Sequence, residues 1–440
     1  MTNKTIKVLH YINQFFGGIG SEEAANHPIE IRDGAVGPGL ALNKSFSNDI
    51  EVIGTIIAGD NYYNEEIDHS NKVVLEALEK YKPDLLIAGP AFNAGRYGVA
   101  CSEVSFLANS IGIPSVTSMF HENPGTLTHR KDIYIIPSSE GVGGMSNALN
   151  GIVKLGKKLY LKNEIGPASE EGYLPRGIRK SGKRSAIGAD RAVEMLISKV
   201  NNIPYETELP IELPEKIIPA PPMKTLSSSK IGLVTSGGLV PMGNPDKLAG
   251  GPSQSWFKYD ISKLNSMNEG EWESVHVGFF TDITNKNPNY ILPLNIVREF
   301  EKNGEIGSIH GEYFSTSGRG TPVADSKRMG REMAHDLKSA NVDAVIMVAT
   351  WGTCNRCGAT IAKEIENAGI PVAFITALFS LALTTGAPRV IRGNRIEHVC
   401  GNPRLSAEDD LNFGSKIIST ALDSIKSTVE EPTLFDPTGN

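Results

Sequence analysis

The chain is predicted to be an α/β protein of two domains, each with a mainly parallel sheet flanked by helices. Three observations lead to this prediction. Short apolar runs alternate with amphipathic stretches, which is the pattern of β-α-β units. A proline-rich segment divides the chain near its middle. The length of 440 residues is sufficient for two or three domains of about 150 residues each.

The first half contains four short apolar runs that are expected to be strands, at residues 6–12, 50–57, 85–88 and 115–119. Helical periodicity lies between them, at residues 71–81 and 102–110. The second half repeats the alternation, with strands at residues 230–235, 342–348 and 372–377 and a helix at 359–367. Strands separated by helices at this spacing favour parallel pairing.

Residues 204–229 (PYETELPIELPEKIIPAPPMKTLSSS) contain six prolines and a closing serine run. Proline removes backbone donors and fixes φ, so this segment is expected to be an extended linker. The predicted domains are therefore residues 1–203 and 230–440, with the linker between them.

The two halves share a local pattern that begins at Asp84 and at Asp343. Each has an apolar strand, a loop, an Arg-x-Gly motif (Arg96 or Arg356), a helix and a Gly-Ile-Pro turn. An ancient internal duplication would explain this pattern, and it requires the same strand order in both halves. The alternative is that many α/β units end a helix with glycine and begin a strand after proline.

Composition excludes several classes of protein. The net charge of −7 argues against a dedicated nucleic-acid or membrane-surface binder, which usually carries a basic excess. No signal peptide is recognisable, and no apolar run approaches the ~18 residues of a membrane span. Four cysteines in a chain of this length cannot form a disulfide framework. A reduced, cytoplasmic protein is therefore expected.

The strongest chemical signal is Trp351-Gly-Thr-Cys354-Asn-Arg356-Cys357-Gly, a W-x-x-C-x-x-C motif that follows a strand and opens a helix. Ligands bind at the carboxyl ends of strands in open α/β sheets. The helix N-terminus and the charge of Arg356 are both expected to lower a cysteine pKa and so favour the nucleophilic thiolate.

Two other interpretations of the two cysteines remain open. A structural zinc site needs two more ligands, but Cys101 and Cys400 stand alone, so no metal is expected. The other interpretation is that both sulfurs are buried and inert. Weaker candidates are Arg32 in a glycine-bounded segment (residues 28–39), His121 beside a turn, and Arg319 in the glycine-rich loop TSGRGT.

Several motifs occur in the order expected for one family. They are YINQFFGGIGSEE (11–23), PIEIRDGAVGPG (28–39), GPAFNAGRYGVAC (89–101), HENPG (121–125), WGTCNRCGATIAKEIENAGIP (351–371) and GNPRL (401–405). The chain resembles the selenoprotein subunit of component B of the glycine, sarcosine and betaine reductases, nearly from end to end.

The resemblance implies a reductase that cleaves the C–N bond of a small amine. Selenocysteine displaces the amine from the α-carbon, after a pyruvoyl group on a partner subunit has captured the substrate. The product then passes to a small selenoprotein carrier and to an acetyl-phosphate-forming component, and thioredoxin supplies electrons. No covalently bound cofactor besides selenocysteine is expected in this chain.

The sequence departs from the family pattern at one position, because Trp351 stands where selenocysteine is expected. The selenocysteine codon UGA differs by one base from the tryptophan codon UGG, so Trp351 is interpreted as a substitute for selenocysteine. If tryptophan is genuine, Cys354 is the best remaining nucleophile. The chain would then be a non-catalytic scaffold or binding subunit, or a thiol–disulfide oxidoreductase that uses Cys354 and Cys357.

The expected roles are therefore as follows. Position 351 is the nucleophile, Cys354 and Cys357 are resolving or supporting thiols, and Arg356 gives electrostatic support. Arg32, Arg96 and His121 are candidate walls of the substrate site, and either arginine would suit a substrate carboxylate.

Overall fold

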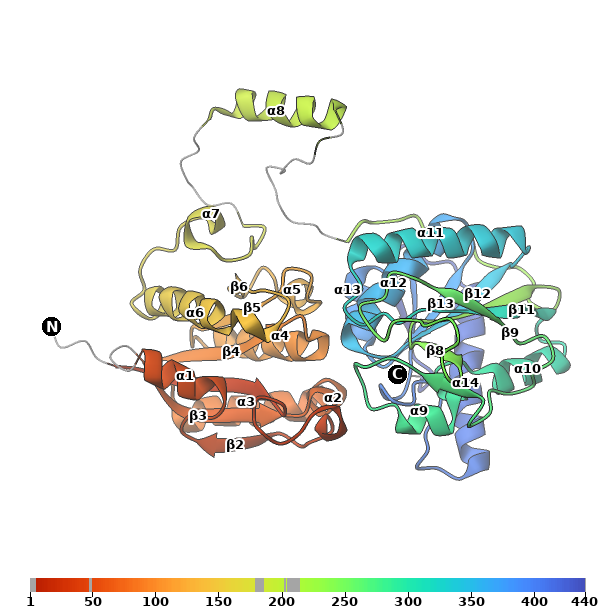
Figure 1. Ribbon diagram of the computed structural model, residues 1–440, viewed down its shortest axis with the longest axis horizontal. Coiled ribbons are helices and arrows are strands. Elements are labelled where there is room, and N and C mark those ends of the chain that lie inside the picture. The colour runs from red at the N-terminus through yellow and green to blue at the C-terminus, as the bar shows by residue number, and fades with distance from the viewer. Residues whose placement is uncertain (1–4, 47–49, 179–185, 202, 204–213, 440) are drawn as a thin grey trace.

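The computed structural model describes residues 5–46, 50–178, 186–201, 203 and 214–439. Two open twisted sheets stand next to each other, and each is covered by helices on both faces (Figure 1). The predicted α/β class with mainly parallel sheets is confirmed.

The first sheet has six strands in the order β2-β3-β1-β4-β5-β6, and only the edge strand β2 runs antiparallel to its neighbour. The strands are β1 (Ile6–Asn13), β2 (Glu30–Asp33), β3 (Ile50–Ala58), β4 (Leu85–Phe92), β5 (Ser115–Met119) and β6 (Ile135–Pro137). The associated helices are α1 (Pro38–Ser45), α2 (Asp60–Glu65), α3 (Ile67–Tyr81), α4 (Gly95–Ser110), α5 (Gly125–Thr128) and α6 (Met145–Tyr160).

Alternation along the central strand explains why both faces of this sheet are covered. In β1, Leu9 and Tyr11 join one apolar cluster, whereas Ile6 and Val8 join another. Successive side chains of a strand point to opposite faces. Helices α3 and α4 supply the first cluster, and α1 and α6 supply the second.

The second sheet has seven strands in the order β15-β14-β13-β12-β7-β11-β9, with β9 antiparallel at one edge. Its strands are β7 (Lys230–Thr235), β9 (Phe257–Asp260), β11 (Ser308–Ser315), β12 (Ala344–Ala349), β13 (Val372–Thr376), β14 (Arg389–Arg392) and β15 (Thr433–Phe435). Its helices are α9 (Asp282–Lys286), α10 (Leu294–Lys302), α11 (Val323–Ser339), α12 (Gly352–Asn367), α13 (Phe379–Thr385) and α14 (Ala407–Lys426). A separate hairpin pairs β8 (Leu239–Pro241) with β10 (Trp272–Ser274).

Both sheets have the same topology. In the first sheet β1 lies between β3 and β4, and in the second sheet β7 lies between β11 and β12. In each sheet the antiparallel edge strand, β2 or β9, comes along the chain between the first two parallel strands. The strand orders therefore agree, as a duplication requires. This doubly wound order also occurs in unrelated α/β proteins, so the duplication stays a prediction.

The two aspartates that begin the shared pattern have the same structural role. The carboxylate of Asp84 accepts a hydrogen bond from the backbone N–H of Lys7 at 3.0 Å, at the start of β1. The carboxylate of Asp343 accepts one from the N–H of Lys230 at 2.7 Å, at the start of β7. Each aspartate therefore fixes the beginning of the central strand of its sheet.

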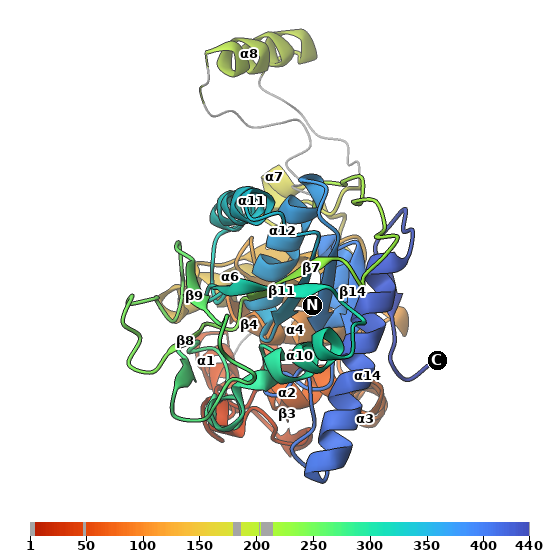
Figure 2. The same ribbon diagram turned by 90° about the vertical axis from the view of Figure 1, so that its right-hand side faces the viewer.

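The connection between the two sheets contains α7 (Ala168–Glu171) and α8 (Gly188–Val200). Figures 1 and 2 show α8 apart from both sheets, and none of its side chains is buried. Residues 204–213 of the predicted linker lie outside the described residues, so the boundary itself stays a prediction. Residues 214–229 form neither helix nor strand, although Ala220 and Leu226 are buried on the second unit.

Within the described ranges, every helix is too short or too polar to cross a membrane.

Candidate functional site

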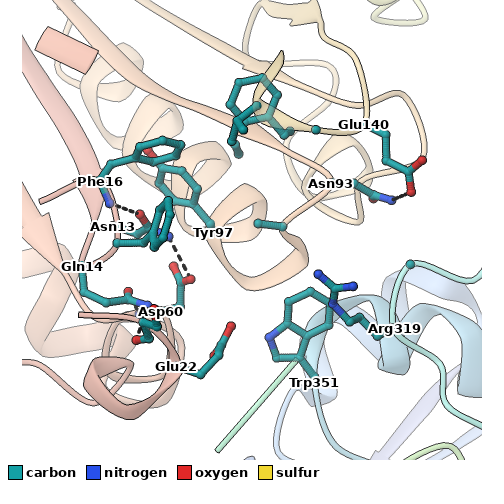
Figure 3. A pocket seen from close by; sticks show the side chains of 18 of the residues that line it. Asn13, Gln14, Phe16, Glu22, Asp60, Asn93, Tyr97, Glu140, Arg319 and Trp351 are labelled. Carbon is teal, nitrogen blue, oxygen red and sulfur yellow. Dashed lines mark hydrogen bonds between the residues drawn. The ribbon is translucent and has the colours of Figure 1, made fainter. Parts of the chain in front are cut away.

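A cavity of about 480 Å³ lies where the two units meet (Figure 3). The first unit contributes the segments that follow β1, β3 and β4, and the second contributes loop residues and the residue that caps α12. In each sheet, the connection that follows the central strand leads to one side of the sheet, and the connection that follows the neighbouring strand leads to the other side. This divergence opens a crevice at the carboxyl ends of the two strands. The cavity is lined by Asn13, Gln14, Phe15, Phe16, Ser21, Glu22, Asp60, Ala91, Phe92, Asn93, Ala94, Tyr97, Glu140, Gly141, Val142, Pro252, Arg319, Gly320 and Trp351.

Trp351 reaches the cavity because it links β12 to α12. It is the residue before the helix and has an extended backbone with φ −87° and ψ 168°. Its side chain is only 5% exposed, and the indole N–H is buried without a hydrogen-bond partner. The ring of His276 packs edge-on against it at a centroid distance of 6.0 Å. The predicted position of the motif, after a strand and at the start of a helix, is confirmed.

Cys354 lies in the first turn of α12 and is fully buried. Its thiol donates to the backbone carbonyl of Ser236 at 3.1 Å, and its sulfur accepts the N–H of Thr350 at 3.4 Å. Ser236 follows β7, the central strand of the sheet. Cys354 therefore ties the start of the helix to the crevice between β7 and β12.

Cys357 lies one turn further along α12 and is also fully buried. Burial raises the pKa of its thiol to about 12, although Arg356 acts in the opposite direction. The expectation that the helix start and Arg356 lower the cysteine pKa is therefore wrong for Cys357, because desolvation outweighs both. All four cysteines are free thiols.

Two arginines, one from each unit, make contacts with the opposite unit. Arg96, in the first turn of α4, is fully buried and donates to Glu22 and Asn61 of its own unit and to the carbonyl of Gly278 across the interface at 3.0 Å. Arg356, in α12, donates to the carbonyl of Thr321 at 2.7 Å and lies 3.5 Å from the carboxylate of Glu122 in the first unit. Burial lowers the pKa of Arg356 from its usual value.

The backbones of α4 and α12 also touch at their N-terminal ends. A Cβ atom added to Gly95 would lie 2.6 Å from the backbone nitrogen of Thr353, and one added to Gly352 would lie 2.6 Å from that of Arg96. Real Cβ atoms do not approach so closely. Glycine at both positions is therefore what allows the two helix starts to meet beside the cavity.

Two predicted wall residues lie elsewhere. Arg32 is on the edge strand β2, where it pairs with Glu30 at 2.6 Å and donates to the carbonyl of Gly17 at 3.3 Å. His121 is exposed and packs against the ring of Phe120 at 4.2 Å. Neither lines the cavity.

The cavity contains polar residues that the sequence reasoning did not single out, namely Asn13, Gln14, Glu22 and Asp60. Asn13 and Asp60 end or follow two of the predicted strands, β1 and β3. A polar side chain directly after a buried strand is the signal that would have found them, because this is where parallel sheets bind ligands. Across the described part of the chain, no group of three or more His, Cys, Asp or Glu side chains is suited to hold a metal ion.

The fold and the site define an α/β protein with a polar-lined cavity between two doubly wound units, next to a residue that caps a helix. Residues 5–350 match the family described as glycine/sarcosine/betaine reductase selenoprotein B, and the chain belongs to that family. The match ends directly before Trp351. The family resemblance drawn from the sequence motifs is confirmed.

Relatives of three named activities cover nearly the whole chain. The glycine reductase complex component B subunit gamma of Carboxydothermus hydrogenoformans is 43% identical, over 98% of this chain and 99% of its own. The sarcosine reductase complex component B subunit beta of Peptoclostridium acidaminophilum is 41% identical, over 98% and 100%. The betaine reductase complex component B subunit beta of the same organism is 38% identical, over 98% and 99%.

Proposed function

We propose that this chain is the substrate-specific subunit of component B in a reductase complex that cleaves the C–N bond of a small amino acid. The observation that carries the proposal is the position of residue 351. Its side chain lines the cavity between the units, at the start of α12, with Arg96 and Arg319 nearby. A helix N-terminus and two cations favour an anionic nucleophile at this point.

The surroundings of residue 351 suit a selenocysteine side chain. Nε2 of His276, whose ring packs against residue 351, and Nε of Arg96 are both buried, and neither has a hydrogen-bond partner among the described residues. Nδ1 of His276 accepts the N–H of Gly278 at 3.0 Å, so the neutral ring carries its proton on Nε2. Tryptophan offers these donors no acceptor, whereas a selenolate does. Selenocysteine would supply a nucleophile that is ionised at neutral pH.

The other residues of the motif act by positioning and support. Cys354 holds the helix start against Ser236, and Cys357 fills the interior behind it. Arg356 fixes the helix to the loop that carries Glu122. Arg96, which is fully buried in the opposite unit, packs against residue 351.

The proposal includes partners that the family implies. A subunit that carries a pyruvoyl group would present its carbonyl at the open side of the cavity. A small selenoprotein carrier would take the product, with thioredoxin as the indirect source of electrons. The four free cysteines suit the reducing cytoplasm, where we place the complex.

The codon and the mass of residue 351 in the native protein test the assignment. We expect UGA and selenocysteine, and a UGG codon contradicts the assignment.

The function is tested by amine release from glycine, sarcosine and betaine with the pyruvoyl subunit present. We expect release with selenocysteine, slower release with Trp351→Cys, and none with Trp351→Ser, which matches cysteine in size without its nucleophile.

A non-catalytic binding subunit is the second candidate. Trp351 fits its site, with its ring 5.4 Å from the guanidinium of Arg96. A UGG codon, together with substrate binding and no amine release, would favour this candidate. A thiol–disulfide oxidoreductase is not favoured, since both Cys354 and Cys357 are fully buried.

A further inference from the structure

The cavity has an acidic side chain with one oxygen that is not hydrogen-bonded within the described residues. Asp60 is the first residue of α2, directly after β3, and is 4% exposed. Its Oδ2 accepts a hydrogen bond from the amide of Asn13 at 3.0 Å, but its Oδ1 is buried and finds no hydrogen-bond partner in the part of the chain that the structure describes. Burial raises the pKa of Asp60 to about 6, so the carboxylate is mostly ionised at pH 7. A buried, half-satisfied carboxylate is costly unless a ligand completes it.

The cavity also has a cation with no carboxylate partner. Arg319 lies in the loop between β11 and α11, and Figure 3 shows its guanidinium beside Trp351, across the cavity from Asp60. Among the residues that the structure describes, no acidic side chain lies within 4.0 Å of it. By contrast, Arg32, Arg96 and Arg356 are paired with Glu30, Glu22 and Glu122. Arg319 is therefore the available carboxylate receptor, in place of the two arginines that the sequence suggested.

We propose that a zwitterionic amino acid lies across the cavity before the pyruvoyl carbonyl captures it, with its carboxylate on Arg319 and its protonated amine on Asp60. This inference rests on the proposed function and specifies how its substrate is held. The planar guanidinium offers a carboxylate two parallel hydrogen bonds. The two charges lie on opposite walls, so a ligand with both charges satisfies both side chains. Residue 351 lines the same cavity, and Figure 3 shows it beside Arg319.

The unpartnered oxygen of Asp60 also selects among amines. A primary or secondary ammonium group donates an N–H to Oδ1 and so satisfies it. A trimethylammonium group has no N–H and leaves the buried oxygen without a hydrogen bond, which costs affinity. The site is therefore assigned to an amino acid of the glycine or sarcosine type, in preference to betaine.

Binding to the isolated full-length chain tests this assignment without turnover. Calorimetric titration would use glycine, betaine, acetate (carboxylate only) and glycinamide (amine only). Arg319→Gln is expected to weaken glycine and acetate binding about tenfold or more and to leave glycinamide unchanged. Asp60→Asn is expected to weaken glycine and glycinamide about tenfold and to leave acetate unchanged. Arg319→Lys should restore part of the acetate binding.

Matched controls are Arg331→Gln and Asp68→Asn, which neutralise exposed residues outside the cavity. Both should bind all ligands like the unchanged chain, and thermal melting checks that every variant is folded. The proposal is overturned if the unchanged chain does not bind glycine, if betaine binds as tightly as glycine, or if each variant weakens all ligands equally. Absence of amine release in the complex, with the binding pattern intact, contradicts only the proposed function.

Discussion

The guanidinium of Arg96 lies 5.4 Å from the centre of the Trp351 ring, although the two residues belong to different units. Arg96 begins α4 in the first unit, and Trp351 caps α12 in the second. The same guanidinium donates to the carbonyl of Gly278, which is also in the second unit. One fully buried side chain thus connects the first unit to the position that we assign to the nucleophile.

Replacement of Arg96 should therefore weaken the whole interface. Arg96→Met leaves the buried carbonyl of Gly278 and the side chain of Asn61 without their donor, and Glu22 without its ion pair. We expect a loss of about 2–4 kcal/mol in the free energy of unfolding, measured by urea denaturation. Arg331→Met, at a side chain that is 61% exposed, is the control and should change stability by less than about 0.5 kcal/mol. Equal losses in both variants would contradict the bridging role.

The glycine contact between α4 and α12 gives a second prediction. Alanine is a better helix former than glycine, so Gly95→Ala should stabilise α4 if only local structure mattered. The added Cβ meets the backbone of Thr353 at 2.6 Å, so we expect the opposite, a loss of about 1–3 kcal/mol. Gly143→Ala, where nothing lies within 4 Å of the added Cβ, is the control. A stabilised Gly95→Ala variant would show that the units do not touch there.

The cysteines should resist alkylation in the folded protein. All four are buried, and burial raises the pKa of Cys357 to about 12 and also raises the pKa of Cys101 and Cys400. Iodoacetamide at pH 8 should modify none of them until the protein is unfolded, when mass spectrometry should find all four modified. Native labelling of Cys354 would instead support the thiol–disulfide alternative.

The carboxylate of Asp60 makes stability depend on pH in a specific direction. Its pKa is raised to about 6 in the folded protein from an ordinary value near 3.8. The folded state therefore binds more protons than the unfolded state between about pH 4 and pH 6, and this group lowers stability as pH rises through that window. Burial is the main cause, and Glu22 acts with it, while Arg96, Asn13 and Gln14 oppose it.

Asp60→Asn should remove this effect. Relative to the unchanged chain, the variant should gain about 2 kcal/mol of stability between pH 4.5 and pH 7. Urea denaturation at the two pH values measures the difference, and Asp68→Asn controls for a surface carboxylate. A difference between variant and unchanged chain that does not vary with pH would mean that Asp60 titrates normally in the fold.

The sequence predicted the central strands well because they are short, largely buried apolar runs, but it did not predict β9, β11, β14 and β15 of the second sheet. It placed the helix starts less well. The predicted helices at 102–110 and 359–367 begin at Gly95 and Gly352 in the structure. Glycine and the polar residues after it carry little helical periodicity, so the pattern does not mark the first turn of either helix. Glycine stands at both helix starts because the two helix ends touch there.

The sequence likewise predicted some residues of the candidate site and not others. Trp351 and its motif were found because all their residues are adjacent in the chain. Arg319 was named only as a weaker candidate and Asp60 was not found, since the two reach the same cavity only through the packing of one unit on the other. Arg32 was placed in the site because it is a charged residue between glycines, and His121 because it lies beside a turn. An edge strand and an exposed loop have the same local features, and these are where the two residues lie.

The contribution of one wall by each unit has an evolutionary consequence. We assign amine selection to Asp60 in the first unit and the reacting position to residue 351 in the second, and both residues line the cavity. Substitutions around Asp60 can therefore change which amine is accepted without altering the reactive loop. Chimeras that exchange residues 5–178 between relatives named for glycine and for betaine should transfer amine preference with that half, provided that Gly95 and Gly352 are retained at the joint.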